Sequence, residues 1–406
     1  MKKHMILVAV ATLTLASCAK IETINTNPVV DENIPIGFTN YTYRSLTKAD
    51  DTFVDNNSTS PLVVGKKFGV YAYSTTNNNA WTTALTATGN AVFMNGVEVE
   101  FGTNGNTDAT ANTYSPMRYW PSGDTPDWLT FWAYYPVQSG NGITYTTPSG
   151  SNGLGTFAFT AASTAATMVD FMVADVVNDK IYGTAAEASS NTHVAANGVV
   201  PLHFHHMLTK VQFKFKTNLT TTELENTKVY LTEAKLVDIR TQRTLNAAYT
   251  TTDGTSTSWA DGTDAAAKAD TPADYEIYVT ADGTSTSKNV SSTDKIDLTR
   301  TATTPAASEV FLMVPQTMVA KAGTNPQVLH VEWDVVTAGV TTHNSKDLYF
   351  YSDLVTSDTD DTSVGAINWA KNNSITYTVT IGPKPIRFTA DVASWDGETN
   401  GYLNVW

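Results

Sequence analysis

The chain has 406 residues, with 25 Lys and Arg against 39 Asp and Glu, a single Cys and 41% apolar residues. At about 100–200 residues per domain, this length predicts two or three domains. The net charge of −14, without any Lys/Arg tract, argues against nucleic-acid binding because nothing would neutralise phosphates. One Cys excludes a disulfide framework and a Cys-based zinc site. The composition is typical of an acidic, β-rich protein, and we predict no enzymatic activity.

The first eighteen residues have the layout of an export signal. Lys2 and Lys3 form a positive region, and residues 5–15 are apolar but too short to span a bilayer. The next segment, LASC, ends at Cys18 and resembles the lipobox of bacterial lipoproteins, where the thiol is lipidated and the chain is cut before the Cys. We predict a signal peptide over residues 1–17 and a lipid such as palmitate on Cys18; an ordinary signal peptide with a chance Cys is the alternative.

An alternating run follows a polar, tether-like segment. Ile34, Ile36 and Phe38 fall on one face of a predicted strand that extends over residues 34–43. Basic residues come directly after it, within residues 44–49. The pattern predicts a first strand followed by an accessible basic site.

Two series of short β-branched or aromatic runs follow, each run bounded by Gly, Pro, Asn or Ser. They predict an all-β fold of two β-sandwiches joined near 217–226, with an N-terminal sandwich over 49–222 and a C-terminal one over 223–406. Residues 211–216 alternate between apolar and polar, which indicates an antiparallel sheet with one buried face. The first series comprises 68–73, 92–101, 114–120, 129–135, 168–177 and 199–215, and the second 229–239, 275–279, 310–314, 328–335, 348–351, 375–381 and 386–392.

Long tracts rich in Thr, Ser, Ala, Gly and Asn separate these runs. Such tracts bury little apolar surface, so we expect them to lie outside the core as surface loops. They are residues 138–166, 183–198, 251–272 and 281–308.

One histidine cluster, at residues 203–206, is a candidate metal site. On a strand, His203 and His205 share a face, which permits a pair of metal ligands. No Cys remains after export, and no adjacent acidic residue completes the set. We therefore predict no metal and no cofactor, with the histidines at a strand edge or satisfied in the core.

Catalytic signatures are missing from the sequence. Ser, His and Asp are plentiful, but no GxSxG elbow occurs. The acidic run at 358–361 lacks the central Gly and final Glu of a calcium loop. We predict no catalytic residues.

Aromatic residues are dense between 119 and 135. Alternation places Phe131 on one side of a predicted strand and Trp132 and Tyr134 on the other. Such aromatics form the inner face of a sandwich, or, if one face is exposed, a surface that stacks on sugar rings. The second interpretation gives the alternative function, a monomeric surface lipoprotein that binds glycans.

The last six residues also alternate. Leu403 and Val405 fall on one face, and Tyr402 and Trp406 lie on the other, together with an Asn. A free terminus with this pattern is a candidate strand donor to a neighbouring molecule. The alternative is that it forms the last strand of its own domain.

Seven segments distributed over the whole chain carry a family resemblance. They are LASC at 15–18, the strand and basic site at 34–49, WLTFWAYYP at 128–136, DFMVA at 170–174, residues 201–210, residues 311–316 ending in VPQ, and residues 373–381 followed by Trp395. Together, in this order, they resemble the fimbrillin family of Bacteroidales, which includes major and minor fimbrial subunits.

The resemblance implies two tandem transthyretin-like β-sandwiches and a structural role in adhesive surface pili. It implies export as a lipoprotein of the outer membrane, then cleavage by a trypsin-like protease that releases the subunit to an extracellular fimbrium. Its partners would be other subunits, including tip and anchor, and a host or bacterial surface ligand. Cys18 matches the lipidated residue; Lys48, before Ala49, best matches the processing position, with Arg44 second.

In this scheme residues 18–48 are a lipidated propeptide, and the strand containing Ile34, Ile36 and Phe38 is lost. A sandwich without an edge strand exposes unpaired backbone groups beside an apolar slot. A donated strand satisfies both, with backbone hydrogen bonds and alternate side chains in pockets. Head-to-tail donation does not close on itself, so it extends a filament.

Overall fold

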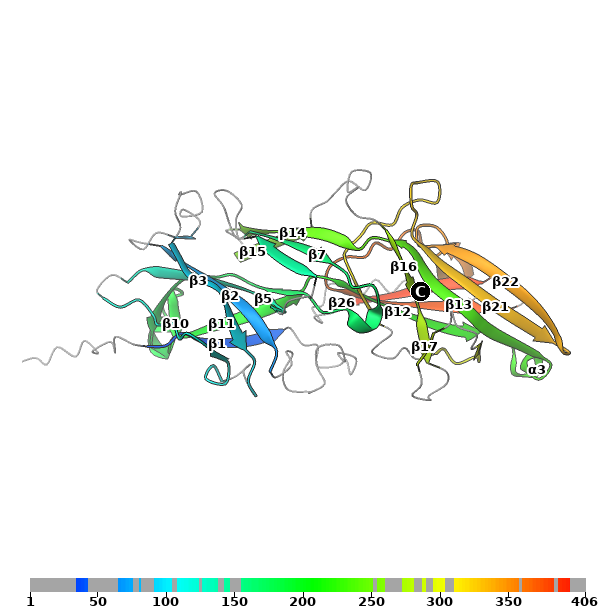
Figure 1. Cartoon of the computed structure of the whole chain (residues 1–406), viewed down its shortest axis with the longest axis horizontal. Helices are drawn as coiled ribbons and strands as arrows, with labels where there is room; N and C mark the ends of the chain where they lie inside the picture. The colour runs from blue at the N-terminus through cyan, green and yellow to red at the C-terminus, as the bar shows by residue number, and fades with distance from the viewer. Residues whose placement is uncertain are drawn as a thin grey trace, which may run out of the picture.

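A computed structural model describes residues 34–42, 65–75, 80–81, 91–103, 108–123, 126–137, 142–146, 155–250, 254–259, 272–280, 287–289, 295–303, 310–357, 360–382 and 386–394. Almost every element in these ranges is a β-strand, which confirms the all-β prediction. The strands build an elongated molecule, with a large N-terminal sheet at one end and a pair of packed sheets at the other (Figure 1). No helix in the described ranges is long and apolar enough to cross a membrane.

The N-terminal sheet has nine strands. Its main path runs β1-β11-β8-β5-β2-β3-β4, while β9 pairs with β5 and β10 pairs with β9. The bounds are β1 Gly37–Thr42, β2 Lys67–Thr75, β3 Ala91–Glu100, β4 Thr113–Tyr114, β5 Trp128–Tyr135, β8 Met172–Ala174, β9 Val177–Gly183, β10 Val194–Ala196 and β11 Val199–His206.

Two sheets face each other at the C-terminal end. One runs β20-β12-β25-β26, and the other runs β16-β13-β21-β22 with β19 beside β13. Tyr275 of the second sheet meets Phe311 of the first, with ring centroids 6.0 Å apart, so the two sheets pack as a sandwich. The bounds are β12 Thr209–Thr217, β13 Thr227–Ile239, β16 Ala273–Glu276, β19 Ile296–Asp297, β20 Phe311–Met313, β21 Val328–Thr337, β22 Val340–Tyr349, β25 Asn373–Ile381 and β26 Arg387–Ser394.

A third layer, β15-β14-β7-β6, lies between these ends (Figure 1). Its strand β7 comes from the N-terminal part of the chain, before residues 203–206, and its strand β14 comes from the C-terminal part. The pairing of β7 with β14 therefore connects the two parts of the chain. The bounds are β6 Ile143–Thr146, β7 Thr156–Thr160, β14 Gln242–Thr250 and β15 Gly254–Trp259; the remaining elements are β17 Tyr278–Thr280, β18 Ser287–Asn289, β23 Val355–Ser357, β24 Asp360–Ser363, the short helices α2 Ala185–Ala188 and α3 Thr221–Leu224, and the 3-10 turn η2 Ala165–Thr167.

The expectation that the Thr- and Ser-rich tracts lie outside the core was wrong in part. Phe157 and Phe159 of β7 are buried, and so is Leu298, in the tract that follows β18. Phe157 packs against Trp132 and Phe171, with centroid distances of 5.4 and 5.2 Å. A few large apolar side chains therefore fix strands inside tracts whose average composition is polar.

The pairing of strand β12 shows to which of the two sandwiches this strand belongs. Its inward side chains alternate as predicted, with Val211, Phe213 and Phe215 buried. It pairs antiparallel with β20 but parallel with β25, so the prediction of purely antiparallel pairing was wrong on one flank. By sheet membership β12 belongs to the C-terminal sandwich, and we propose that the domain boundary lies before Thr209 rather than at 222.

The hairpin β21–β22 carries a row of alternating charges. A two-residue turn at Ala338 and Gly339, both with positive φ, sets the register. His330 Nδ1 lies 2.7 Å from Asp347 Oδ1 and His343 Nδ1 lies 2.8 Å from Asp334 Oδ1, each pair directly opposite across the two strands. Such cross-strand pairs stabilise a sheet.

Glu332 links the two pairs into one row. Its carboxylate lies 3.3 Å from His330 Nε2 and 3.5 Å from His343 Nε2, and Lys295 closes the far end against Asp334. Burial lowers the pKa of His330, but the hydrogen bonds with Asp347 and Glu332 outweigh it and raise the pKa above the ordinary value of about 6.5; Lys235 opposes the rise.

His330 should therefore make stability depend on pH. A raised pKa means that its contribution is complete below about pH 6.5 and is lost as the pH rises through the folded-state value. We expect His330→Gln to cost about 0.5–1 kcal/mol more at about pH 5.5 than at about pH 8, measured by urea unfolding. Lys346→Gln, on the other face of the hairpin, is the control; an equal pH dependence in both variants would contradict the assignment.

Candidate assembly site: the first strand and its slot

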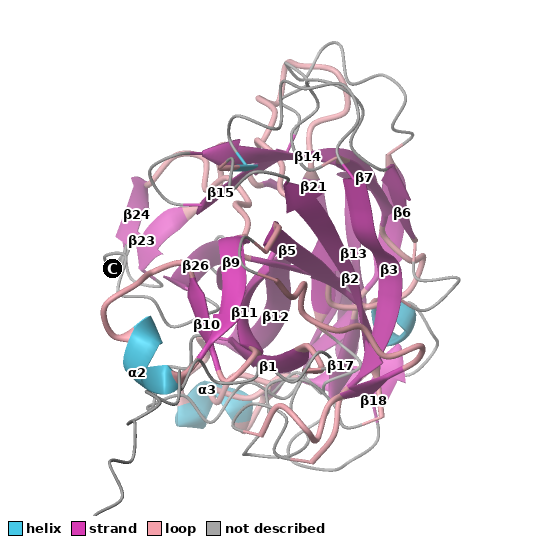
Figure 2. Ribbon diagram, turned by 90° about the vertical axis from the view of Figure 1, so that its left-hand side faces the viewer, coloured by secondary structure: helices cyan, strands magenta, loops and turns pink. Residues whose placement is uncertain are grey.

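Strand β1 lies at the end of the N-terminal sheet path. It forms a parallel ladder with β11 in which Gly37 is opposite Val199 and Thr42 is opposite Phe204. Both views place β1 beside β11 at the margin of the sheet (Figures 1 and 2). A full backbone ladder therefore holds β1 on one flank.

The inward face of β1 fills an apolar core. Ile36 is 1% exposed and Phe38 is fully buried. The Phe38 ring meets Tyr114, Phe131 and Phe68 at centroid distances of 5.6, 6.0 and 6.5 Å. Ile34 packs against the same core from a partly buried position, as the sequence alternation predicts.

The other flank of β1 has no ladder in the described part of the chain. At its start, the N–H of Ile36 donates to the carbonyl of Arg118 and the carbonyl of Ile34 accepts from the N–H of Trp120, each at 2.9 Å. Farther along, side chains take over: Asn112 Nδ2 donates to the carbonyl of Phe38 at 3.0 Å. The Tyr114 hydroxyl donates to the carbonyl of Ile36 at 2.8 Å.

These contacts define a slot. The sheet curls until its last strand, β4, and the preceding Asn112 approach its first strand, and β1 occupies the seam between β4 and β11. We call this the β1 slot: the inner faces of β11, β2 and β5, closed by Asn112, Tyr114 and residues 118–120. When β1 occupies the slot, the core is complete, but β1 forms a β-ladder with only one of the elements that line the slot, β11.

Gly198 shapes the entrance of the slot. Its φ is +75°, and its carbonyl accepts from both Gly37 N–H and the Trp120 indole N–H, each at 3.0 Å. A Cβ at this position would lie 2.9 Å from Trp120 Nε1. Glycine is therefore required both by the backbone conformation and by the close approach of Trp120.

Most of the other predicted site residues lie outside the described residues. They are Cys18, Arg44, Lys48, Ala49, Tyr402, Leu403, Val405 and Trp406. In the covalent chain, residues 43–66 connect β1 to β2. A cut after Arg44 or Lys48 would therefore leave β1 attached to the rest of the molecule only by non-covalent contacts.

The histidine cluster divides between two faces of β11. On one face, His206 Nδ1 lies 2.8 Å from Asp170 Oδ2, and both side chains are at most 5% exposed. His203 and His205 share the opposite face, where both contact Asp175. The sequence argument missed Asp175 because it follows β8, some thirty residues earlier in the chain, and only the β8–β11 pairing brings it close.

Both faces of β5 pack into the core, as expected for the inner face of a sandwich, with Trp128 and Tyr134 half-buried; the alternative of an exposed sugar-stacking face is wrong for this strand. Phe131 belongs to the core of the curled sheet, and Trp132, 1% exposed, belongs to the second core under β7. Tyr134 packs on Phe157 with ring centroids 5.0 Å apart. Burial likewise raises the pKa of Tyr73, on the same side of the sheet, to about 12.

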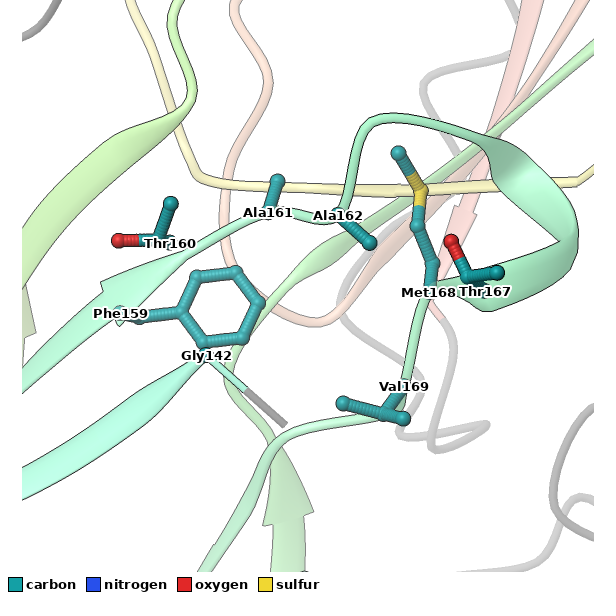
Figure 3. Close-up of a pocket in the computed structure, with 8 residues that line it drawn as sticks. All are labelled: Gly142, Phe159, Thr160, Ala161, Ala162, Thr167, Met168 and Val169. Atoms are coloured by element: carbon teal, nitrogen blue, oxygen red, sulfur yellow. The ribbon is translucent and has the colours of Figure 1, made fainter. Parts of the chain in front are cut away.

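A cavity of about 220 Å³ lies where β7 leads into η2 (Figure 3). Its lining is apolar apart from Thr160 and Thr167, with Phe159 and Met168 as the largest side chains. No charged residue is among the described residues that line this cavity.

The fold and the slot define a class of proteins: all-β proteins in which the first strand completes a domain from the edge of a sheet. The fimbrillin-like family matches residues 47–395. The chain belongs to this fimbrillin-like family, as the sequence resemblance predicted.

Two similar proteins illustrate the relationship. A fimbrium subunit Fim1C of Phocaeicola vulgatus is 29% identical over 248 residues, which cover 58% of this chain and 57% of that protein; the chain thus spans less than two thirds of this relative. A crystal structure of a fimbrial protein from Bacteroides vulgatus superposes with a TM-score of 0.55 at 18% identity, covering 89% of this chain and 99% of that one. This likeness shows a shared fold.

Phe38 should be the side chain on which β1 docking depends most. We expect Phe38→Ala to destabilise the N-terminal sheet by about 3–5 kcal/mol, because it leaves a cavity among aromatic rings. Hydrogen exchange at β11 amides provides the measurement, since these amides report on the ladder directly. The control is Thr39→Ala, on the outward face, expected within about 1 kcal/mol of wild type. Equal exchange in the two variants would show that the slot does not depend on Phe38.

Proposed function

We propose that this protein is a structural subunit of cell-surface fimbriae that polymerises when β1 is removed and replaced by a strand of another subunit. The observation that carries the proposal is the position of β1. Its inward side chains are buried in the core, but its backbone forms a β-ladder on one flank only. Membership of the fimbrillin-like family supports the same role.

Loss of β1 would leave a strongly adhesive surface. The backbone of β11 from Val199 to Phe204 would lose its ladder partner. At the same time Phe68 and Phe131 would lose the ring of Phe38 that now covers them. Unpaired backbone beside an apolar slot is the arrangement that β-strand addition satisfies.

Proteolysis provides the trigger in this scheme. While β1 is tethered, its effective concentration at the slot is on the order of millimolar or higher, so a strand from another molecule cannot compete. A cut after Lys48, or after Arg44 as second choice, removes that advantage. β1 can then dissociate, and the vacated slot accepts an intermolecular strand.

The C-terminal segment is the proposed donor. Its alternation offers Leu403 and Val405 on one face and Tyr402 and Trp406 on the other, a pattern that suits a slot with alternating pockets. Since donor and slot are different surfaces of one subunit, each addition leaves a new donor or a new slot at the end. The contact therefore extends without closing.

The proposed life cycle starts at the outer membrane. Lipid on Cys18 anchors the exported precursor, a trypsin-like protease removes residues 18–48, and the subunit joins an extracellular fimbrium. Its partners are other fimbrial subunits and, at the exposed surface, a host or bacterial ligand. A purely structural role requires no catalytic residue and no cofactor.

Cleavage and polymerisation should be coupled through the release of β1. We expect limited trypsin digestion of the Cys18→Ser precursor to cut near Lys48 and to produce high-mass species in size-exclusion chromatography. Lys48→Gln should move the cut to Arg44, and the double Lys48→Gln, Arg44→Gln variant should stay intact there and monomeric. Mass spectrometry identifies the cuts.

A crosslinked control separates cutting from release. Thr39→Cys with Pro201→Cys places two thiols opposite each other across the β1–β11 ladder. The oxidised variant should be cut yet stay monomeric, and reduction should start polymerisation. Polymers that grow before reduction would show that β1 need not leave. If the precursor without the crosslink is cut but stays monomeric and is retarded on polysaccharide, the result would support a glycan binder.

Removal of the donor should stop polymerisation without affecting cleavage. We expect a chain lacking residues 401–406 to be cut normally and to remain monomeric, because its slots find no strand. Adding a synthetic peptide of residues 397–406 should then occupy the slots and raise the unfolding temperature of the cut subunit. Normal polymers from the truncated chain would place the donor elsewhere.

A further inference from the structure

Three side chains meet on the outer face of β8 and β11. Phe204 is the register partner of Ala174, and the N–H of Asp175 donates to the carbonyl of His203 at 2.8 Å, which extends the pairing by one residue. Asp175 thus lies directly opposite His203, and His205 lies two residues farther along β11 on the same face. Two neighbouring strands therefore fix all three residues.

The three side chains converge on one point. Asp175 Oδ2 lies 3.0 Å from His203 Nδ1 and 3.0 Å from His205 Nε2, and the candidate ligand atoms all lie within 4.8 Å of one another. Ligand atoms around a zinc ion, at bond lengths of about 2.0–2.1 Å, are about 2.9–3.4 Å apart. The two Asp175–His distances match neighbouring corners of such a shell, and the 4.8 Å limit keeps all three donors within reach of one ion after small side-chain adjustments.

The cluster is also accessible and suitably charged. The side chains of His203, His205 and Asp175 are 9%, 24% and 42% exposed, so exposure increases toward the carboxylate and solvent reaches it. Burial disfavours ionisation of Asp175, but hydrogen bonds from both imidazoles outweigh it and hold the pKa of the carboxyl below its usual range. Lys371 interacts electrostatically with this carboxylate.

We propose that Asp175, His203 and His205 bind a divalent first-row transition metal ion, with Zn²⁺ as the reference ion. Two imidazole nitrogens and one carboxylate oxygen form a donor set that suits such ions, and water completes the coordination. The ion would join the end of β8 to β11, the strand that pairs with β1. This site is independent of any strand exchange.

The row of charges on β21–β22 provides a contrast within the same molecule. There His330 and His343 have separate partners in Asp347 and Asp334, and Glu332 contacts each of them through a different oxygen. Their ion pairs spread along the hairpin instead of meeting at one oxygen. His343 is therefore a control: an exposed histidine beside a carboxylate, outside the proposed site.

Isothermal titration with Zn²⁺ tests the site, using the exported chain with Cys18→Ser so that the thiol does not bind metal. We expect one Zn²⁺ per chain in wild type, at least tenfold weaker binding in Asp175→Asn, and loss of binding in the double variant His203→Gln, His205→Gln. His343→Gln should bind as wild type does. Co²⁺ absorption, an independent readout, should show the wild-type bands in His343→Gln and lose them in the double variant.

Circular dichroism without metal confirms that each variant is folded, and His205→Gln, at the more exposed position, replaces the double variant if that one is not. Absence of Zn²⁺ uptake by wild type would overturn the proposal. So would unchanged affinity in Asp175→Asn and His205→Gln, or a loss in His343→Gln as large as in those variants.

Discussion

The insertion of Phe38 into the aromatic core between β11 and Tyr114 is the contact on which the N-terminal sheet depends. It draws β1 into the seam of a curled sheet and covers Phe68 and Phe131. A backbone ladder secures this strand along one flank. The other flank is held by a single antiparallel bridge at Pro35 and Tyr119 and then by the side chains of Asn112 and Tyr114. The strand is thus necessary for a complete core and is still held at an edge, a combination of strong burial with one-sided pairing.

Local patterns in the sequence predicted what depends on local physics. Alternation at Ile34, Ile36 and Phe38 identified the inward face of β1, and alternation at 211–216 identified the buried face of β12. These predictions succeeded because the two faces of a strand are set by successive residues alone. The all-β class followed from the same signals repeated along the chain. The family followed from the order of its motifs.

What the sequence could not provide depends on pairing between distant segments. The residues next to His203 in the sequence do not predict its contact with Asp175, because this contact depends on the pairing of β8 with β11. The parallel partner of β12 lies in β25, more than 160 residues away, and an alternating pattern does not encode strand direction. Phe157 and Phe159 show a third limit: two buried rings determine a strand within a tract whose composition is typical of a loop.

The position of β1 at the edge of its sheet has a consequence for the export of the subunit. Under the proposed function, β1 covers the apolar slot of its own chain until the chain is cut, so the precursor would be exported with that slot closed. A cut between β1 and β2 would leave β1 held only by non-covalent contacts, so that it could dissociate. Under the proposed function, fibre growth then begins where and when the protease cuts the chain, once β1 leaves its slot.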